Sequence, residues 1–306
     1  MKYIDAIRNV IINEMENNEK IIVMGQDVRE WGGSSGLFKG LDKRFKCRVI
    51  NTPISEAATV GIGIGAAMNG MRPIIEFTFF DFLLCAADPI INHAAKIKAL
   101  SNGDFNVPLI IRGVLSSHRG YGATHSQNLE YIFMCPGLNV VYPSNPDDAA
   151  GLMRYALNQS DPVLFIEHKL LHNMEGEVTS ELVPFGKAKI RQKGKNLGII
   201  TYGRLVPIVE RIIKDMDVEL LDLRSLNPLD KESIIAISRK AEKILIIEDG
   251  IGFVASKVAA IVHENSNAKV KILHAKEFPI PAAKNLENYV LLTDDKITEV
   301  ITSFIK

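Results

Sequence analysis

Short runs of wholly apolar residues alternate along this chain with longer segments of helical periodicity, and this alternation limits the possible folds more than any other feature. In the first half the apolar runs cover residues 21–24, 73–77, 107–111, 140–142 and 163–166, and the helical segments cover residues 56–68, 82–100 and 147–158. Strands that are apolar on both sides are typical of a parallel sheet with helices on both faces. The pattern therefore predicts an α/β fold.

A polar, irregular stretch over residues 168–185 interrupts the alternation, and we expect the linker between two domains there. Beyond it, strands are predicted at residues 197–201, 218–221, 244–247 and 270–273, and helices at residues 205–214, 231–240, 253–265 and 294–305. The chain of 306 residues is long enough for two domains, each with its own core. We expect the first domain over residues 1–175 and the second over residues 185–306.

Charge and hydropathy argue against several classes of partner. The 36 basic residues balance 36 acidic residues, which disfavours nucleic acid or an anionic membrane as the main partner. No apolar run in the sequence is long enough to span a bilayer. The N-terminal segment predicts an amphipathic helix rather than a signal peptide, with an apolar side formed by Tyr3, Ile4, Ile7, Val10 and Ile11.

The three cysteines are odd in number and far apart, at Cys47, Cys85 and Cys135. Their spacing matches neither a zinc site nor a disulfide framework. A reduced, cytoplasmic protein is the simplest interpretation of this cysteine content.

Residues 51–68 contain the most informative local pattern. A turn with Pro53 leads into a predicted helix that Ser55 is positioned to cap and whose first turn contains Glu56. Small residues at Gly61 and Gly65 would let another backbone pack very close to this helix. Taken alone, the pattern is also explained by an acid that complements the helix dipole and by glycines in an ordinary interface.

A series of short landmarks runs in one order along nearly the whole chain. They lie at residues 25–28, 48–56, 72–77, 81–82, 91–96, 108–113, 125–127, 136–138, 143–147 and 222–230. With these landmarks the sequence resembles the beta subunit of the first component of 2-oxoacid dehydrogenase complexes, a family that includes the pyruvate, branched-chain and acetoin enzymes. The resemblance implies a parallel-sheet thiamine diphosphate pyrimidine-binding domain, followed by a transketolase C-terminal-like α/β domain. It also implies an enzyme that decarboxylates a 2-oxo acid and passes the acyl group to a lipoyl acceptor.

The resemblance further implies which residues act. Glu56 would hydrogen-bond N1′ of the aminopyrimidine ring and favour the imino tautomer, whose 4′ nitrogen removes the C2 proton. Phe82 would stack on this ring, and Ile54 is a further expected cofactor-binding residue. His125 would exchange protons as the acyl group passes to the lipoyl acceptor, a role that suits an imidazole. Without the resemblance, Phe82 would be interpreted as a core residue and His125 as a loop histidine bonded to backbone groups.

Other residues near the landmarks leave alternatives open. His118 and Arg119 could bind a substrate carboxylate or could be solvated loop residues. Arg112 follows an apolar run, and we expect a structural ion pair there. Near the expected pocket the sequence departs from the family at Gln26, Pro89 and Thr124. These departures leave the substrate and the acceptor unspecified.

The half of the site that binds the diphosphate and Mg²⁺ is missing from this sequence. The superfamily uses Gly-Asp-Gly with a later Asn, and the nearest match, Glu248-Asp249-Gly250, lacks that Asn. We therefore expect an alpha subunit to provide the diphosphate site and the Mg²⁺ ligands, with no metal ligand on this chain. The resemblance implies two alpha and two beta chains, a beta–beta contact through the second domain, and docking of a lipoyl acyltransferase. The three glycines of residues 61–65 predict that their helix lies at the alpha contact.

Two other functions are compatible with the sequence. A split transketolase, which transfers two-carbon units between sugars, would use the same pyrimidine domain and the same Glu56. Thr124-His125 weakly favours that enzyme, whereas Ser126-Gln127 and residues 222–230 favour the dehydrogenase. The second alternative is a catalytically degenerate subunit kept for assembly, against which the presence of Glu56 and His125 argues.

Overall fold

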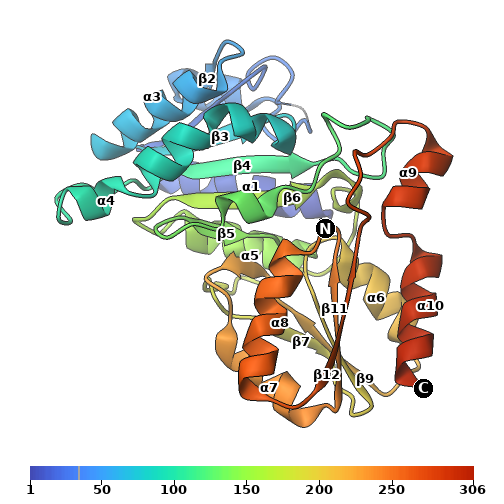
Figure 1. Cartoon of the computed structure of the whole chain (residues 1–306). Coiled ribbons are helices and arrows are strands. Elements are labelled where there is room, and N and C mark those ends of the chain that lie inside the picture. The colour runs from blue at the N-terminus through green and yellow to red at the C-terminus, as the bar shows by residue number, and fades with distance from the viewer. Residues whose placement is uncertain (34) are drawn as a thin grey trace.

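Two layered α/β halves, one above the other in Figure 1, form the computed structural model, which describes residues 1–33 and 35–306. The first half contains a seven-stranded sheet in the order β10-β5-β6-β4-β3-β1-β2. Its strands are β1 (Ile21–Gly25), β2 (Val49–Asn51), β3 (Arg72–Phe77), β4 (Ile110–Leu115), β5 (Asn139–Val141), β6 (Val163–His168) and β10 (Ser225–Asn227). Neighbouring strands from β5 to β2 are parallel, and β10 pairs with β5 in the antiparallel sense. The predicted parallel sheet is confirmed.

Helices cover both faces of this sheet because its central strands point alternate apolar side chains into two layers. Along β1, Ile21 and Val23 pack toward α1 and α5, whereas Ile22 and Met24 pack toward α3. None of the described helices is long and apolar enough to cross a bilayer. The helices of this half are α1 (Tyr3–Asn17), α2 (Leu41–Phe45), η1 (Lys46–Arg48), α3 (Glu56–Met68), η2 (Phe80–Ala86), η3 (Pro89–Ala94), α4 (Ile97–Leu100), η4 (Glu130–Phe133), α5 (Pro146–Ala156) and η5 (Lys169–Leu171).

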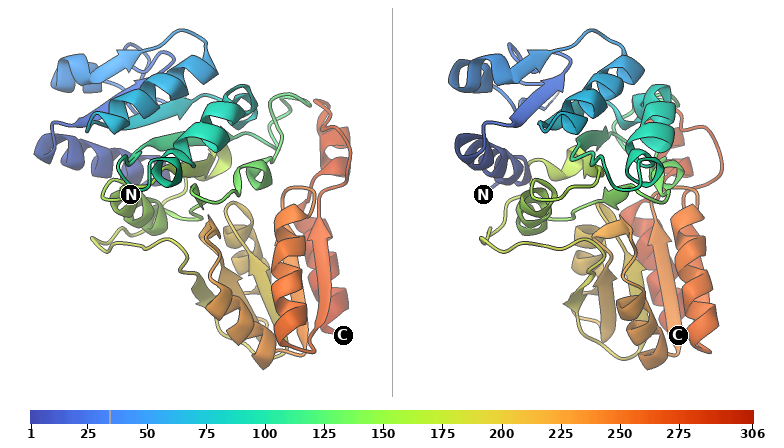
Figure 2. Two further views of the ribbon diagram at one scale, coloured as in Figure 1. Left: turned by 60° about the vertical axis from the view of Figure 1, so that its left-hand side comes forward. Right: turned by 90° about the vertical axis from the view of Figure 1, so that its left-hand side faces the viewer.

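The second half contains a five-stranded sheet in the order β12-β11-β8-β9-β7, with an antiparallel edge strand β7 and parallel strands elsewhere. Two helices, α7 and α8, cover one face, and α6 and α10 cover the other (Figures 1 and 2). The elements are β7 (Lys189–Gln192), β8 (Leu197–Thr201), α6 (Leu205–Ile213), β9 (Val218–Asp222), α7 (Lys231–Lys240), β11 (Lys243–Glu248), α8 (Phe253–Asn265), β12 (Lys269–His274), α9 (Lys284–Val290) and α10 (Asp294–Ile305).

Most expected elements agree with the structure, and two do not. The helices predicted over residues 56–68, 231–240, 253–265 and 294–305 are confirmed with those bounds. The single helix expected over residues 82–100 is wrong, because the segment is divided into η2, the π-helix η3 and α4. Pro89 begins η3, and without an N–H group it cannot continue an α-helical hydrogen-bond ladder. The strand expected at residues 107–111 begins only at Ile110, after Pro108, which cannot donate to a sheet.

Two local expectations are also corrected. Ser55 precedes α3, but its side chain makes no capping hydrogen bond, and the Thr59 hydroxyl instead donates to the Ser55 carbonyl over 2.8 Å. Arg112 lies within β4 rather than after it. Its guanidinium is fully buried and pairs with Glu167, with Nη2 2.9 Å from Oε2, and with Glu76 at 2.9 Å. The structural ion pair expected at Arg112 is therefore confirmed.

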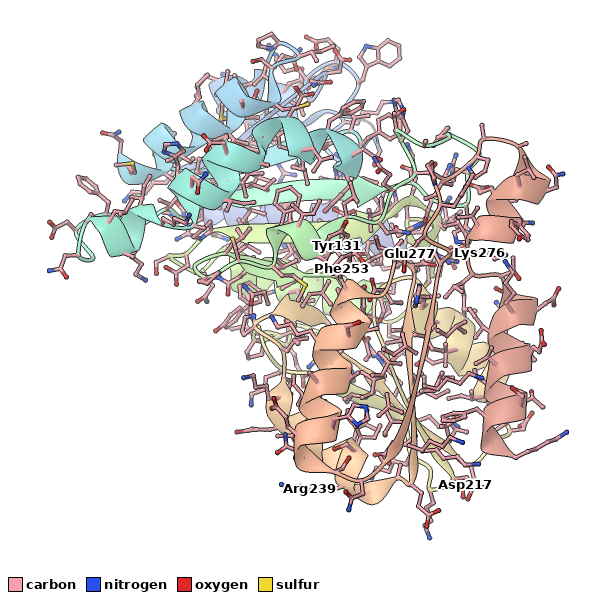
Figure 3. All side chains as sticks on the ribbon, viewed as in Figure 1. Tyr131, Asp217, Arg239, Phe253, Lys276 and Glu277 are labelled. Atoms are coloured by element: carbon pink, nitrogen blue, oxygen red, sulfur yellow. The ribbon has the colours of Figure 1, made fainter. Side chains whose placement is uncertain are left out.

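The two halves share an extensive junction. Strand β10 crosses from the second half to pair with β5, and one apolar cluster extends from Tyr142 in the first half to Ile200 in the second. At the edge of the junction Tyr131 stacks on Phe253, with ring centroids 4.4 Å apart (Figure 3). A junction with this much apolar packing fixes the second half relative to the first.

A buried acid lies inside this junction. Glu130 of η4 is 1% exposed, and its Oε1 accepts a hydrogen bond of 2.9 Å from the Tyr202 hydroxyl of the second half. Burial, and secondarily the nearby Glu248 carboxylate, raise the pKa of Glu130 to about 8. The folded chain therefore holds a proton at Glu130 that the unfolded chain releases above about pH 4.5.

This proton makes the stability of the chain depend on pH. The contribution of neutral Glu130 is complete below the unfolded pKa and is lost as the pH rises toward the folded pKa. Relative to Glu130→Gln, which is neutral at every pH, the unfolding free energy of the parent should fall by about 1.4 kcal/mol per pH unit between those two pKa values. Urea unfolding at a series of pH values measures this, with the exposed Glu264→Gln as control. Parallel stability curves for parent and Glu130→Gln would contradict the assignment.

Candidate active site

The residues predicted to act all follow the carboxyl ends of parallel strands. Glu56 comes after β2, Phe82 after β3 and His125 after β4. Since β2, β1, β3 and β4 are neighbours with the same direction, these carboxyl ends lie along one edge of the sheet. Ligands of parallel α/β sheets bind at this edge.

Glu56 is the first residue of α3 and is half-buried. Its side chain makes no hydrogen bond or ion pair with any other residue that the structure describes, so the carboxylate is available to a ligand. The positive end of the α3 dipole favours a negative charge here. Two residues earlier, Ile54 is 80% exposed, which leaves an apolar surface next to this acid.

His125 and Phe82 lie together in an aromatic cluster. The His125 ring meets Phe82 edge-on at 5.1 Å between centroids and meets Phe79 edge-on at 4.8 Å, and Tyr121 contacts Phe79 at 5.7 Å. Phe82 is half-buried, whereas its neighbour Phe80 belongs to the core. The structure therefore favours a partly open ring at Phe82 over a core residue, and it brings this ring against His125.

Thr124 and Asp81 contact the His125 region, and no site role was predicted for either of them. The Thr124 hydroxyl lies 2.9 Å from Nδ1 of His125, so a position that departs from the family touches the predicted catalytic ring. Asp81 is 5% exposed, and its Oδ1 accepts hydrogen bonds from Gln127 N (3.1 Å) and Nε2 (3.0 Å). Burial raises the pKa of Asp81. The signal in the sequence that could have identified Asp81 is its position directly before Phe82 in the landmark at residues 81–82.

His118 and Arg119 have different surroundings. His118 Nε2 lies 2.7 Å from Nη2 of Arg204 in the second half and 3.6 Å from the Asp249 carboxylate, so its ring takes part in a contact between the halves. The His118 side chain is 10% exposed, so the solvated alternative is wrong, whereas substrate binding by His118 stays a prediction. Arg119 is exposed, with its guanidinium 5.6 Å from the centre of the Tyr121 ring.

Glu248-Asp249-Gly250, the nearest match to the diphosphate motif, is engaged within the chain. Glu248 accepts hydrogen bonds from the Gly252 and Ala255 amides at the start of α8. Asp249 accepts two hydrogen bonds of 2.7 Å from Arg204. Burial alone would raise the pKa of Asp249, but the Arg204 guanidinium holds it well below its usual range. Among the described residues, no group of three or more His, Cys, Asp or Glu side chains could hold a metal ion.

A cavity of about 460 Å³ lies beside the His125 region, between the two halves. Gln127 and Tyr131 line it from the first half, and Lys276 and Glu277, labelled in Figure 3, line it from the second. Glu56, Phe82 and His125 are not among its lining residues. The predicted site is therefore an open edge of the sheet rather than this cavity.

Comparison with protein families divides the chain in two. Residues 1–174 match the family described as the transketolase pyrimidine-binding domain, and residues 186–297 match the transketolase C-terminal domain. The residues that the sequence assigned to cofactor binding all fall within the first of these matches.

Proteins of similar sequence cover nearly the whole chain. The 2-oxoisovalerate dehydrogenase subunit beta of Bacillus subtilis (strain 168) is 40% identical, over 97% of this chain and 96% of its own length. The pyruvate dehydrogenase E1 component subunit beta of Rickettsia felis is 35% identical over the same shares. The mitochondrial pyruvate dehydrogenase E1 component subunit beta-1 of Arabidopsis thaliana is 36% identical, over 94% of this chain and 84% of its own length.

Two solved structures of similar fold are transketolases. A split gene transketolase, solved as an inactive beta4 tetramer, has a TM-score of 0.81 at 19% identity and is matched over 98% of this chain and 97% of its own. The transketolase of Leishmania mexicana has a TM-score of 0.77 at 17% identity, over 99% of this chain and 45% of its own. At these identities the likeness shows a shared fold.

Proposed function

Because this chain belongs to the family of beta subunits of the first component of pyruvate and branched-chain 2-oxo acid dehydrogenase complexes, we propose that it forms the aminopyrimidine half of a thiamine diphosphate site. The complete enzyme would decarboxylate a 2-oxo acid and pass the acyl group to a lipoyl acceptor. The observation that supports this most is the unengaged Glu56 carboxylate, at the same sheet edge as Phe82 and His125.

Each residue at this edge suits one part of the cofactor. Thiamine diphosphate, when bound, supplies the nucleophilic carbon and the electron sink that decarboxylation needs. Glu56 would hold a proton at N1′ of the aminopyrimidine ring, and Phe82 and Ile54 would provide its apolar contacts. His125 would exchange a proton with the reacting group as the acyl unit leaves for the lipoyl acceptor.

We propose that an alpha subunit provides the diphosphate site and the Mg²⁺ ligands. The supporting observation is that Glu248 and Asp249 already bind partners within the chain. The proposed assembly contains two alpha and two beta chains, with domains over residues 1–175 and 185–306, the second of which joins the beta chains and docks the acyltransferase. We also propose a reducing compartment such as the cytoplasm, which suits the three unpaired cysteines.

The exposed face of α3 is the proposed contact with the alpha subunit. Ile54 and Ile62 are 80% and 59% exposed, and among the described residues no atom outside the adjoining backbone of α3 lies within 4 Å of a Cβ built at Gly61 or Gly65. Glycine costs about 1 kcal/mol in a helix interior relative to alanine, so two open glycines need a compensating contact. Gly63 differs, because a Cβ there would lie 2.6 Å from the Ile75 side chain of the same domain.

The alternatives are less well supported. A split transketolase shares the fold, but the transketolase structures are 17–19% identical to this chain, whereas the dehydrogenase beta subunits named above are 35–40% identical. An assembly subunit without catalytic function would not need an available carboxylate at Glu56 on the sheet edge that also carries Phe82 and His125.

Glu56→Gln tests the proposed catalytic role directly. The substitution preserves the shape of the side chain and removes its acid, so the complex reconstituted with the alpha subunit should lose turnover by a factor on the order of 10² or more. Exchange of the C2 proton of the cofactor, followed by NMR, should slow in parallel, while the thermal midpoint of the chain stays near that of the parent. Glu264→Gln, an exposed acid on α8, is the matched control. Parental proton exchange in Glu56→Gln would refute the role.

Gly65→Leu and Gly63→Leu form a matched pair that tests the alpha contact. Gly65→Leu adds a side chain to open space, so the chain alone should keep its thermal midpoint, whereas the dissociation constant of the alpha–beta complex should rise by about tenfold or more. Gly63→Leu forces a side chain against Ile75, so it should lower the thermal midpoint of the chain alone. The contact is elsewhere if Gly65→Leu binds the alpha subunit as tightly as the parent does.

A further inference from the structure

The loop that contains His125 has little structure of its own. Residues 116–128, here called the His125 loop, connect β4 to η4 without a helix or strand. Within it, the His125 amide donates to the Gly122 carbonyl over 3.3 Å. His118, Gly120 and Gly122 have positive φ angles, a backbone conformation that is not maintained by local hydrogen-bond ladders. The conformation of the loop therefore depends on what packs against it.

Helix α9 of the second half packs against this loop. Figures 1 and 2 show α9 and the segment before it, in dark red, next to the green loop that follows β4. Glu287, which is 0% exposed, accepts a hydrogen bond from the Gly120 amide over 3.0 Å, across 167 residues of sequence. Lys284 donates to Glu287 over 3.1 Å and to the His118 carbonyl over 3.0 Å. An ion pair between the buried Glu287 and the exposed Lys284 thus binds two backbone groups of the loop.

Two glycines lie at this approach, which is tight at Gly120 and of ordinary contact distance at Gly122. A Cβ at Gly120 would lie 3.1 Å from the Ala282 carbonyl oxygen, and one at Gly122 would lie 3.6 Å from the Ala282 Cβ. The backbone just before α9 therefore runs directly over the loop at the two positions with no side chain. The close approach of Ala282 to the loop is consistent with Glu287 and Lys284 contacting backbone atoms of the loop rather than its side chains.

The second half also holds the far end of the loop. Asn128 donates to the Asp249 carbonyl over 3.0 Å, and the Asp249 carboxylate fixes Arg204, which contacts His118. Ties to the second half therefore lie on both sides of His125 in the sequence. A catalytic side chain on such a loop stays in position only while the contacts that fix the loop are intact. A displacement of the side chain by about 1 Å can reduce the rate roughly 10²-fold.

We propose that the second domain, through Glu287 of α9, positions His125 for the acyl-transfer step. Glu287 is a positioning residue that acts through the Gly120 amide and the His125 loop. The inference rests on the proposed function for the role of His125, whereas the attachment of the loop to α9 can be tested without it.

Hydrogen exchange on the chain alone tests the attachment. Glu287→Ala removes the acceptor of the Gly120 amide, so peptides spanning residues 116–122 should exchange at least about tenfold faster, while the strands of both sheets keep parental rates. Glu287→Gln retains an acceptor for that amide and should restore most of the protection. Leu286→Ala, an exposed residue of the same helix, is the control for effects on α9 itself. Unchanged exchange of residues 116–122 in a folded Glu287→Ala chain would overturn the proposal.

A double-mutant cycle in the complex with the alpha subunit and a lipoyl domain tests the link to His125. Glu287→Ala should reduce acyl transfer to the lipoyl group on the order of 10-fold, with C2 proton exchange of the cofactor at the parental rate. In a His125→Ala background the same substitution should have little further effect. A full effect in that background would overturn the proposal, because Glu287 would then act independently of His125. If His125→Ala alone transfers at the parental rate, the proposed function of His125 fails, and the exchange experiment still decides whether Glu287 holds the loop.

Discussion

The parallel pairing of β2, β1, β3 and β4 is the constraint on which the rest of the structure depends. Because these strands share one direction, the segments that follow them lie along one edge of the sheet, and residues 56, 82 and 125 lie in those segments although they are far apart in the sequence. Strands β1, β3 and β4 are buried on both faces, so the chemistry at the edge is supported by the two apolar layers beneath it.

The junction adds a second level of organisation. Strand β10 extends the first sheet from the second half, and an apolar cluster joins the two cores. Polar contacts lie at the rim of this junction, where Arg204 and Asp249 meet His118, and Glu287 meets Gly120. The second half thus contacts the backbone of the loop that contains His125, in addition to any contact that it makes with other subunits.

Periodicity predicted the fold class and most helix bounds, because the spacing of apolar residues within a segment shows whether a helix or strand is buried on one face or on both. It failed over residues 82–100, where apolar spacing continues through changes of helix type that Pro89 introduces. Strand β10 has three residues and no periodic signal, and its pairing depends on the contact between the halves. The partners of His118 and Gly120 lie 86 and 167 residues away, so no local pattern could indicate them. The roles of Glu56, Phe82, Ile54 and His125 came from the resemblance and stay proposals. Among the described residues the Glu56 carboxylate has no hydrogen-bond or ion-pair partner, and the rings of Phe82 and His125 are in contact.

The central claim is that this chain provides half of a cofactor site. Calorimetric titration of thiamine diphosphate with Mg²⁺ into the chain alone, into the alpha subunit alone and into their mixture tests it most directly. The account predicts weak or absent binding to this chain alone and tight, Mg²⁺-dependent binding to the mixture. Tight, Mg²⁺-dependent binding to this chain alone would contradict it, since the described residues would then have to bind the diphosphate as well as the pyrimidine ring.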